Sequence, residues 1–448
     1  MPDRRCQKGE NDFLNLKELF DEFPMLTNHL PRIMAVRQKF PASPAVDVSA
    51  SLRQQFVRVL SKVKPGALIA VAVGSRGITN LEAIVTTVVE ILKTARAQPF
   101  IVPAMGSHGG ATPEGQREIL AEYGITEERL KVPIEAAMEV ERLGVTEDGV
   151  DAYFSVAAQQ AEGVIIVNRI KPHTDFGGVF GSGLLKMMVV GLGKRVGAAN
   201  YHISASRLGY EHVLRSIARV TLRSAPILGG VGIIENQLHQ TAKLAVLTAD
   251  EFEAEEAKLF VEAKALMPRL PFDDIDLLIV DRIGKNISGA GMDPNITGRW
   301  VHGYSSALGG KGQSGPVVRR LLVRELTPET HGNAIGIGLA DVTTTRLVQA
   351  MDKRVTYINA LTSLTPNSAK IPIHFDTDRE AIAQALASLG SRDTSQARVV
   401  RIADTLSLEK LEVSEPYAEL IRGRTDLEPL NQPDEMKFDN ADKLLPLT

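Results

Sequence analysis

The chain has 448 residues, of which 44% are hydrophobic and 23% charged, and its formal net charge is −3. This composition is typical of a globular protein, and the near balance of 51 basic and 54 acidic residues leaves no basic surface for nucleic acid or an anionic membrane. The single cysteine, Cys6, excludes an internal disulfide framework, and the first residues lack the apolar core of a signal peptide. We therefore expect a cytoplasmic protein that acts on a small molecule, with no nucleic-acid or membrane partner.

Strand, loop and helix patterns alternate in the first half of the sequence. Residues 67–73 (ALIAVAV) form an apolar run typical of a strand in a parallel sheet, and residues 80–95 have the pattern of a helix. The unit repeats with PFIVP, a loop, and a helix over residues 113–123 for which Thr112 is the expected N-cap. A third unit begins at residues 163–167 (GVIIV). This alternation predicts an α/β fold, in which ligands bind beyond the carboxyl ends of the strands.

The second half repeats the pattern after MPRLPFDD, which has the composition of a linker. The strands expected there are residues 275–280, 334–340 and 398–403. We predict two α/β domains with a cleft between them, the first with a mainly parallel sheet, and a polar tail that docks or frays. The expected boundaries are 1–268, 269–423 and 424–448.

Polar side chains follow several of these strands. Arg76, His108 and His173 lie in strand-end loops, and Lys285 follows the strand at 275–280. The planar guanidinium of Arg76 suits a carboxylate, whereas a solvated loop arginine is the alternative. The two histidines are candidates for proton transfer, with turn positions as the alternative.

One segment, residues 164–202, combines further chemistry. Lys186 lies in apolar GLLKMMVV, where it is either a lysine that reaches the surface or a desolvated amine that serves as an anchor or nucleophile. Gly181, Ser182 and Gly183 could bring backbone N–H groups to a phosphate, although turns explain such glycines as well. His202, taken alone, is more often structural. The sequence contains no complete dinucleotide fingerprint, Walker loop, HExxH motif or G-x-S-x-G elbow.

Together these residues resemble the nickel-pincer-dependent lactate racemase superfamily of 2-hydroxyacid racemases and epimerases. The resemblance rests on GSRG with Arg76, GSHGGAT with His108, KPH with His173, and Lys186 with His202, and it covers residues 65–290. It implies a cofactor, pyridinium-3,5-bisthiocarboxylic acid mononucleotide, that binds nickel between two sulfur-bearing arms.

The resemblance also implies a role for each residue. Lys186 would carry the cofactor, covalently or not, His202 would complete the nickel coordination, and the Gly181–Ser182–Gly183 turn would receive the phosphate. His108 and His173 would be the paired acid and base, and Arg76 and Lys285 would hold the substrate. An isomerase of this kind needs a base on each face of C2, and histidine transfers protons in both directions near its ordinary pKa of about 6.5.

The substrate and two alternatives stay open. Lactate-active members have an acidic residue just before the arginine loop, where this chain has Val73, Gly74 and Ser75, and they have a shorter glycine turn. A stretch with Asp293, Asn295 and Arg299 could serve a larger polyhydroxy or dicarboxylic acid, with Asn295 as a substrate ligand. The alternatives are a zinc or manganese hydrolase that uses the same histidines, and a non-catalytic protein that binds a nucleotide or sugar phosphate.

Overall fold

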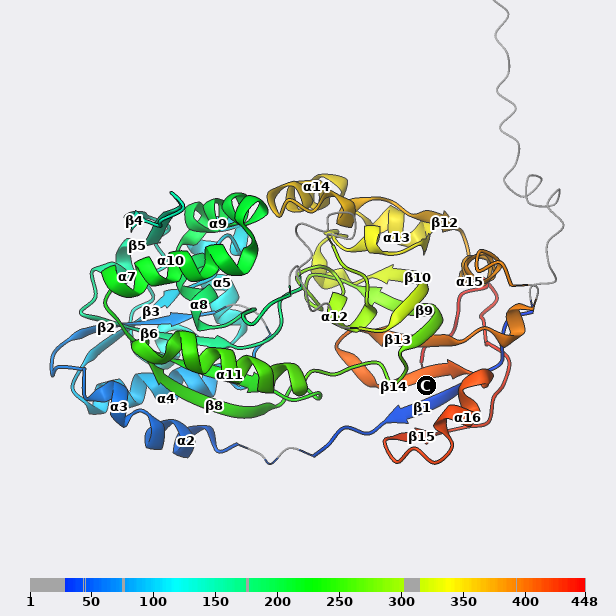
Figure 1. Cartoon of the computed structure of the whole chain (residues 1–448), viewed down its shortest axis with the longest axis horizontal. Coiled ribbons are helices and arrows are strands. Elements are labelled where there is room, and N and C mark those ends of the chain that lie inside the picture. The colour runs from blue at the N-terminus through cyan, green and yellow to red at the C-terminus, as the bar shows by residue number, and fades with distance from the viewer. Residues whose placement is uncertain are drawn as a thin grey trace, which may run out of the picture.

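The computed structural model describes residues 29–447 apart from positions 43, 45, 75–76, 175–176, 302–314 and 392. The described residues form a five-stranded sheet, an eight-stranded sheet and a two-stranded ribbon, with helices around the two larger sheets (Figure 1). Most strand pairs in the two large sheets are parallel. The predicted α/β class with a mainly parallel sheet in the first half is therefore confirmed.

The first sheet has the strand order β3-β2-β6-β7-β8. Its first four strands are parallel, and β8 pairs with β7 in the antiparallel sense. The strands of this half, including the ribbon of β4 and β5, are β2 Leu68–Val73, β3 Gln98–Pro103, β4 Val140–Val145, β5 Asp151–Ser155, β6 Gly163–Arg169, β7 Ile227–Glu235 and β8 Thr241–Thr248.

Helices cover both faces of this sheet, which is why its central strands are apolar throughout. Along β2, Ala70 and Ala72 face one hydrophobic core while Val71 and Val73 face the other. Helices α4 and α10 lie on opposite sides of the sheet (Figure 1). The helices of this half are α2 Val48–Gln55, α3 Val57–Leu60, α4 Leu81–Thr94, α5 Pro113–Glu122, α6 Glu127–Leu130, α7 Val156–Gln159, α8 Leu184–Lys186, α9 Lys194–Leu208, α10 Tyr210–Ser224 and α11 Phe252–Ala265.

The second sheet has the strand order β12-β11-β10-β9-β13-β14-β1-β15. The strands from β12 to β13 are parallel, and the pairs beyond β13 are antiparallel. Its strands are β1 Ile33–Gln38, β9 Asp274–Ile283, β10 Val317–Leu326, β11 Val342–Thr344, β12 Ile373–Phe375, β13 Val399–Asp404, β14 Ser407–Ser414 and β15 Leu427–Pro429. The helices of this half are α12 Pro294–Thr297, α13 Thr345–Ala350, α14 Lys353–Thr362, α15 Asp378–Ala387 and α16 Ala418–Ile421.

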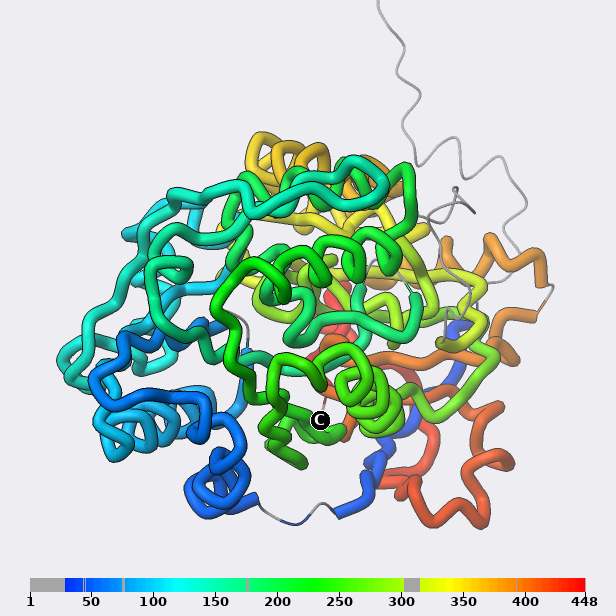
Figure 2. Tube along the Cα trace, turned by 60° about the vertical axis from the view of Figure 1, so that its left-hand side comes forward, coloured from blue at the N-terminus to red at the C-terminus, as the bar shows by residue number. Residues whose placement is uncertain are grey.

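Two features of the second half differ from the sequence predictions. The apolar run at 334–340 is not a strand but contains a 3₁₀ turn at Ile337–Leu339, because Gly336 has a φ of 98° that breaks an extended conformation. Strand β1 pairs with β14 and β15, so residues 33–38 lie in the second sheet although the sequence assigned them to the first domain. Figure 2 shows this N-terminal strand beside the C-terminal segment.

The C-terminal segment docks on the second sheet. Strand β15 extends the sheet edge, and Leu444 is 2% exposed in the core that α15 also contributes to. Among the described residues, no helix is long and apolar enough to cross a membrane.

Candidate active site

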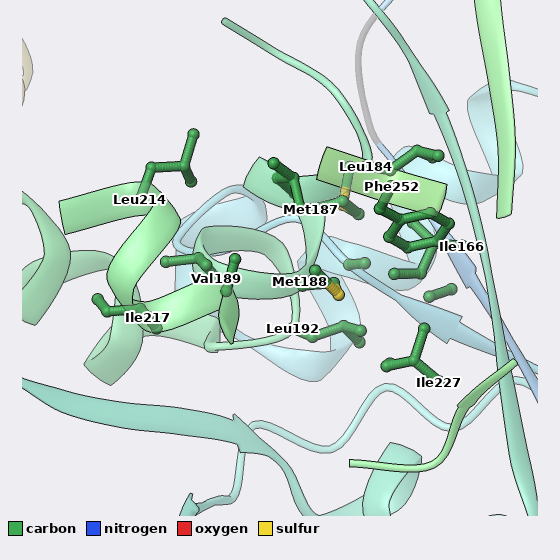
Figure 3. Packing of buried hydrophobic residues seen from close by; sticks show 14 of the residues in the cluster. Ile166, Leu184, Met187, Met188, Val189, Leu192, Leu214, Ile217, Ile227 and Phe252 are labelled. Atoms are coloured by element: carbon green, nitrogen blue, oxygen red, sulfur yellow. The ribbon is translucent and has the colours of Figure 1, made fainter. Parts of the chain in front are cut away.

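The chain segment that carries Lys186 is a continuous helical run with an irregular middle. Helix α8 continues directly into a π-helical stretch, Met187–Gly191, and α9 starts at Lys194. Figure 3 shows how the apolar side chains of this segment pack against β6, α10 and α11; the labelled residues are Ile166, Leu184, Met187, Met188, Val189, Leu192, Leu214, Ile217, Ile227 and Phe252. Such single π turns are frequent at functional sites. Packing therefore fixes the backbone that carries half-buried Lys186.

Three strand-end loops meet at this segment. After β2, a Cβ added at Gly74 would lie 2.6 Å from Asn168 Oδ1 and 2.9 Å from Met187 Cε, so this loop lies close to β6 and to the Lys186 segment. After β3, the N–H of Gly106 donates to the carbonyl of Gly191 over 3.1 Å. The loop after β6 folds back to the same place through His173. The carboxyl ends of β2, β3 and β6 thus converge, as the α/β rule predicts.

His173 and Lys186 are in direct contact. The Nζ atom of Lys186 meets Nε2 of His173, and the His173 side chain is 9% exposed. Paired backbone hydrogen bonds of 2.8 and 2.9 Å between Lys171 and Ser182 hold the intervening loop closed. From the other half, Asn295 donates its side-chain N–H to the His173 carbonyl over 3.2 Å. The structure therefore brings three of the predicted site residues together.

The glycine turn before Lys186 is shaped by a buried acid. Glu256, on α11, is 1% exposed and accepts a 3.0 Å hydrogen bond from the N–H of Leu185. A Cβ on Gly183 would overlap Glu256 Oε1, and one on Gly181 would lie 2.8 Å from Phe260. Burial raises the pKa of Glu256 to about 7, against the backbone N–H groups of Leu185 and Leu184 that lower it. Close packing explains Gly181 and Gly183, and their predicted contact with a phosphate stays a prediction.

His108 lies on a tightly turned loop between β3 and α5. The helix begins as predicted, since Thr112 Oγ1 accepts from the N–H of Gly115 over 3.1 Å. Buried Gln116 donates its side-chain N–H to the carbonyls of Gly106 (3.1 Å) and His108 (3.4 Å). The side-chain oxygen of Gln116 in turn lies 3.3 Å from Nζ of Lys194.

His202 lies on α9, the helix that continues from the Lys186 segment. Its ring packs edge-on against Tyr201, with ring centroids 5.3 Å apart, and near Tyr210 at 6.4 Å. Two aromatic neighbours restrict the orientation of the imidazole. Its predicted role as a nickel ligand stays a prediction.

The predicted substrate residues come from both halves. Arg76 lies outside the described residues, but its neighbour Gly77 is held by Tyr123, whose hydroxyl accepts from Gly77 N–H over 2.9 Å. Lys285 and Asn295 are both on the connection that follows β9, and Lys285 Nζ donates to the Gly289 carbonyl over 2.8 Å. Arg299 is paired with Asp341, with an Nη2–Oδ2 distance of 2.6 Å, so its guanidinium is engaged in an ion pair within the second half.

No group of three or more His, Cys, Asp or Glu side chains placed to hold a metal ion occurs among the described residues. His108, His173 and His202 are all described and do not form one, so the hydrolase alternative gains no support. Three site neighbours were missed in the sequence: Gln116, Lys194 and Glu256. Glu256 had a readable signal, because it occupies the buried face of α11 with Phe252 and Leu259.

Residues 43–209 match the family model described as the lactate racemase N-terminal domain. This match shows that residues 43–209 are similar to the N-terminal domain of lactate racemases. The matched segment of the lactate racemase domain includes His108, His173, Lys186 and His202, whereas Lys285 and Asn295 lie beyond it. The predicted resemblance to the lactate racemase superfamily is therefore supported over residues 43–209.

A solved structure supports the fold over most of the chain. The lactate racemase apoprotein from Thermoanaerobacterium thermosaccharolyticum is similar with a TM-score of 0.51 and 13% identity, over 84% of this chain and 99% of that chain. Because the sequence identity is only 13%, this similarity supports the fold and not a shared activity. A search of curated proteins finds no significant match.

Proposed function

We propose that the chain is a racemase or epimerase that inverts C2 of a 2-hydroxyacid with a nickel-pincer nucleotide cofactor. The observation that carries the proposal is the contact of Lys186 Nζ with His173 Nε2, beside a turn in which Gly181 and Gly183 leave no room for side chains. The amine of Lys186, the imidazole of His173 and the backbone of the glycine turn therefore lie together near the carboxyl ends of β2, β3 and β6. The lactate racemase domain match over the same residues supports this assignment.

The residues present fit the implied cofactor. Lys186 would hold it, His202 would supply an imidazole, which is a suitable nickel ligand, and the Gly181–Ser182–Gly183 turn lies beside the anchor. The described residues provide no protein-only cluster of metal ligands, which agrees with a metal whose other donors come with the cofactor. When bound, the cofactor would accept and return the hydride of C2.

His108 and His173 would then move the hydroxyl proton of the two enantiomers. Each enantiomer presents its hydroxyl from a different side, so a base is needed on each. His173 reaches the site from the end of β6 and His108 from the end of β3, two strands separated by β2 in the sheet. This separation would let the two side chains approach one substrate from different directions.

Arg76, Lys285 and Asn295 would bind the substrate carboxylate and hydroxyl groups. The hydrogen bond of Asn295 to the His173 carbonyl brings the connection after β9 to the loop with the base. Because Arg299 is engaged with Asp341, a larger polyhydroxy or dicarboxylic acid would have to be recognised by the remaining polar groups.

The test is the intact mass and metal content of the chain co-expressed with the enzymes that make the cofactor. Wild type, Lys186→Ala and the control Lys243→Ala, which alters an exposed lysine paired with Glu262, are compared. We expect a nickel-bearing adduct in wild type and control that is lost in Lys186→Ala. Loss of optical purity is then followed for a panel of 2-hydroxyacids.

Other outcomes are informative. Nickel without a mass adduct would retain the reaction and make Lys186 a noncovalent contact. Zinc in place of nickel, with no adduct and no racemisation, would contradict the proposal.

A further inference from the structure

The loop that carries His108 is rich in glycine and holds one other residue, Ala111, in an unfavourable left-handed conformation. Gly106, Gly109 and Gly110 have φ values of 60°, 63° and 65°, and Ala111 follows with 57°. A left-handed φ is unfavourable for alanine, and glycine is flexible in the unfolded and folded chain alike. A loop of this kind needs contacts from outside to hold one conformation.

Gln116 supplies those contacts from the first turns of α5. Its side chain is 0% exposed, and its amide N–H groups bond the carbonyls of Gly106 and His108 on both sides of the turn. The opposite end of the amide is its oxygen, which must also be satisfied because it is buried. That oxygen faces Lys194.

Lys194 is an unusual residue to find there. It is 0% exposed, has a φ of 52° that lysine rarely adopts, and donates from Nζ to the carbonyl of Pro103 over 2.7 Å. Its described hydrogen-bond partners are neutral, so desolvation of the ammonium is not offset by a bonded carboxylate. Burial lowers its pKa to about 8, and the charge of the Glu139 carboxylate opposes this shift.

We propose that Lys194, acting through Gln116, is a positioning residue that holds the His108 loop against the helix bearing His202. The chain of contacts runs from Nζ of Lys194 to Gln116 Oε1 and from Gln116 Nε2 to the backbone on both sides of the turn. The ammonium polarises the amide, which strengthens the hydrogen bonds that the amide donates. This inference rests on the proposed function, because it takes His108 to be one of the two bases.

The first experiment reads the loop directly and needs no cofactor. The chain is labelled at histidine Cε1 with carbon-13, and the signal of His108 is assigned with His108→Asn. Lys194→Met and Gln116→Leu are then compared with wild type and with the control Lys93→Met, which alters a lysine that bonds the carbonyls of Leu130 and Lys131 elsewhere. We expect the His108 signal to shift or broaden in the first two variants, with His173 and His202 unchanged.

The second experiment uses the loaded enzyme. If the loop is mispositioned, kcat should fall by roughly 10- to 100-fold while KM stays within about threefold, since a misplaced base slows chemistry more than binding. The double variant Lys194→Met/Gln116→Leu should be no slower than the worse single variant, because both act on one path.

The outcomes separate the two proposals. Absence of racemisation in loaded wild type would defeat the proposed function, and the histidine signals would still decide whether Lys194 positions the loop. Folded Lys194→Met and Gln116→Leu variants with an unchanged His108 signal and unchanged kcat would overturn the inference, even if their melting temperatures fell. If Lys194→Met does not fold, Gln116→Leu decides the matter, because it breaks the path and keeps the bond of Lys194 to Pro103.

Discussion

Two sets of buried charged residues, one in each half of the molecule, have different hydrogen-bond partners. In the second half, Arg324 and Arg401 are each 3% exposed and both bind Asp281, over 2.6 and 2.8 Å. In the first half, Lys194 and Glu256 are as deeply buried, but their described hydrogen bonds go to neutral groups. The first arrangement bonds opposite charges to each other. In the second, burial lowers the pKa of Lys194, opposed by the Glu139 carboxylate, and raises the pKa of Glu256.

The compensated cluster holds the C-terminal segment in place. Arg324 also bonds Asp378 over 2.5 Å and donates to the Leu444 carbonyl over 2.8 Å, while Arg401 donates to the Leu445 carbonyl over 2.7 Å. Burial would raise the pKa of Asp378, but its bonds to Arg324 and the nearby Arg346 outweigh burial and hold it below its ordinary value. This cluster is a stability element.

The uncompensated charges lie beside the candidate site. Glu256 fixes the turn before Lys186, and Lys194 contacts the support of the His108 loop. A buried charge that is bonded to neutral groups polarises those groups, and its own pKa is strongly shifted. Ionisable residues with shifted pKa values are concentrated at functional sites. We infer that the buried ion pairs of the second sheet stabilise the fold, whereas Lys194 and Glu256 support the candidate site. Each prediction below tests one of these two statements.

The largest effect is expected when the compensated cluster is broken. Arg324→Met leaves Asp281 and Asp378 buried without this partner, and we expect the free energy of unfolding to fall by about 3–5 kcal/mol. Denaturant unfolding of wild type and variant measures the loss. In the control, Arg398→Met removes an exposed pair with Asp274 at 3.0 Å and should cost less than about 1 kcal/mol. Equal losses for the two variants would contradict the distinction.

The next effect tests an uncompensated charge through pH. The folded pKa of Glu256 is about 7 and its ordinary value is 4.5, so between these values the folded chain keeps a proton that the unfolded chain has released. Wild type should therefore lose stability as pH rises through this window, by about 3 kcal/mol from this group alone. Glu256→Gln cannot ionise and should lack that loss.

The measurement is the difference in unfolding free energy between wild type and Glu256→Gln from pH 4 to pH 8. Taking the difference cancels the titration of the other carboxylates. Glu255→Gln is the control, since Glu255 is more exposed and bonded to Lys258. A difference that stays constant with pH would show that Glu256 titrates normally.

Local patterns in the sequence predicted the first sheet well, for a physical reason. The middle residues of strands β2, β3 and β6 are covered on both faces and are therefore apolar, and the polar residues that follow them are easy to recognise. His108 and His173 were predicted as site residues because they lie in these loops, and Lys186 because its neighbours are apolar. The expected strand at 334–340 was wrong because its composition is apolar while Gly336 needs a left-handed φ.

Other features could not be predicted from local patterns. The pairing of β1 with β14 joins segments from opposite ends of the chain, and no periodicity encodes that register. Lys194 and its exposed neighbour Arg195 look alike in GLGKRVG, so nothing marked the first as buried. Burial of a single charge depends on the tertiary packing of β3, α5 and α9.

A third prediction tests how tightly the acid beside Lys186 is packed. Gly183→Ala would bring a Cβ into Glu256 Oε1, and the site is closed by α11, so we expect a loss of about 2 kcal/mol in unfolding free energy. Gly144→Ala is the control, because its Cβ would meet only a methyl group of Val220 at 3.2 Å. The loss at Gly183 should also lower the rate at which Lys186 reacts with an acylating reagent, because the turn that carries it is displaced.

The smallest effect is expected at the rim of the compensated cluster. Lys443 Nζ lies 2.7 Å from Glu325 Oε1, but the two side chains are 47% and 31% exposed, so water solvates both charges if the pair is broken. Lys443→Met should therefore change the free energy of unfolding by only about 0.5 kcal/mol, measured by the same denaturant titration as Arg324→Met. Lys443 lies in the C-terminal segment that Arg324 contacts, and both residues pair with a carboxylate. A loss as large as that of Arg324→Met would mean that pairing itself, and not burial of the paired charges, determines the strength of the cluster.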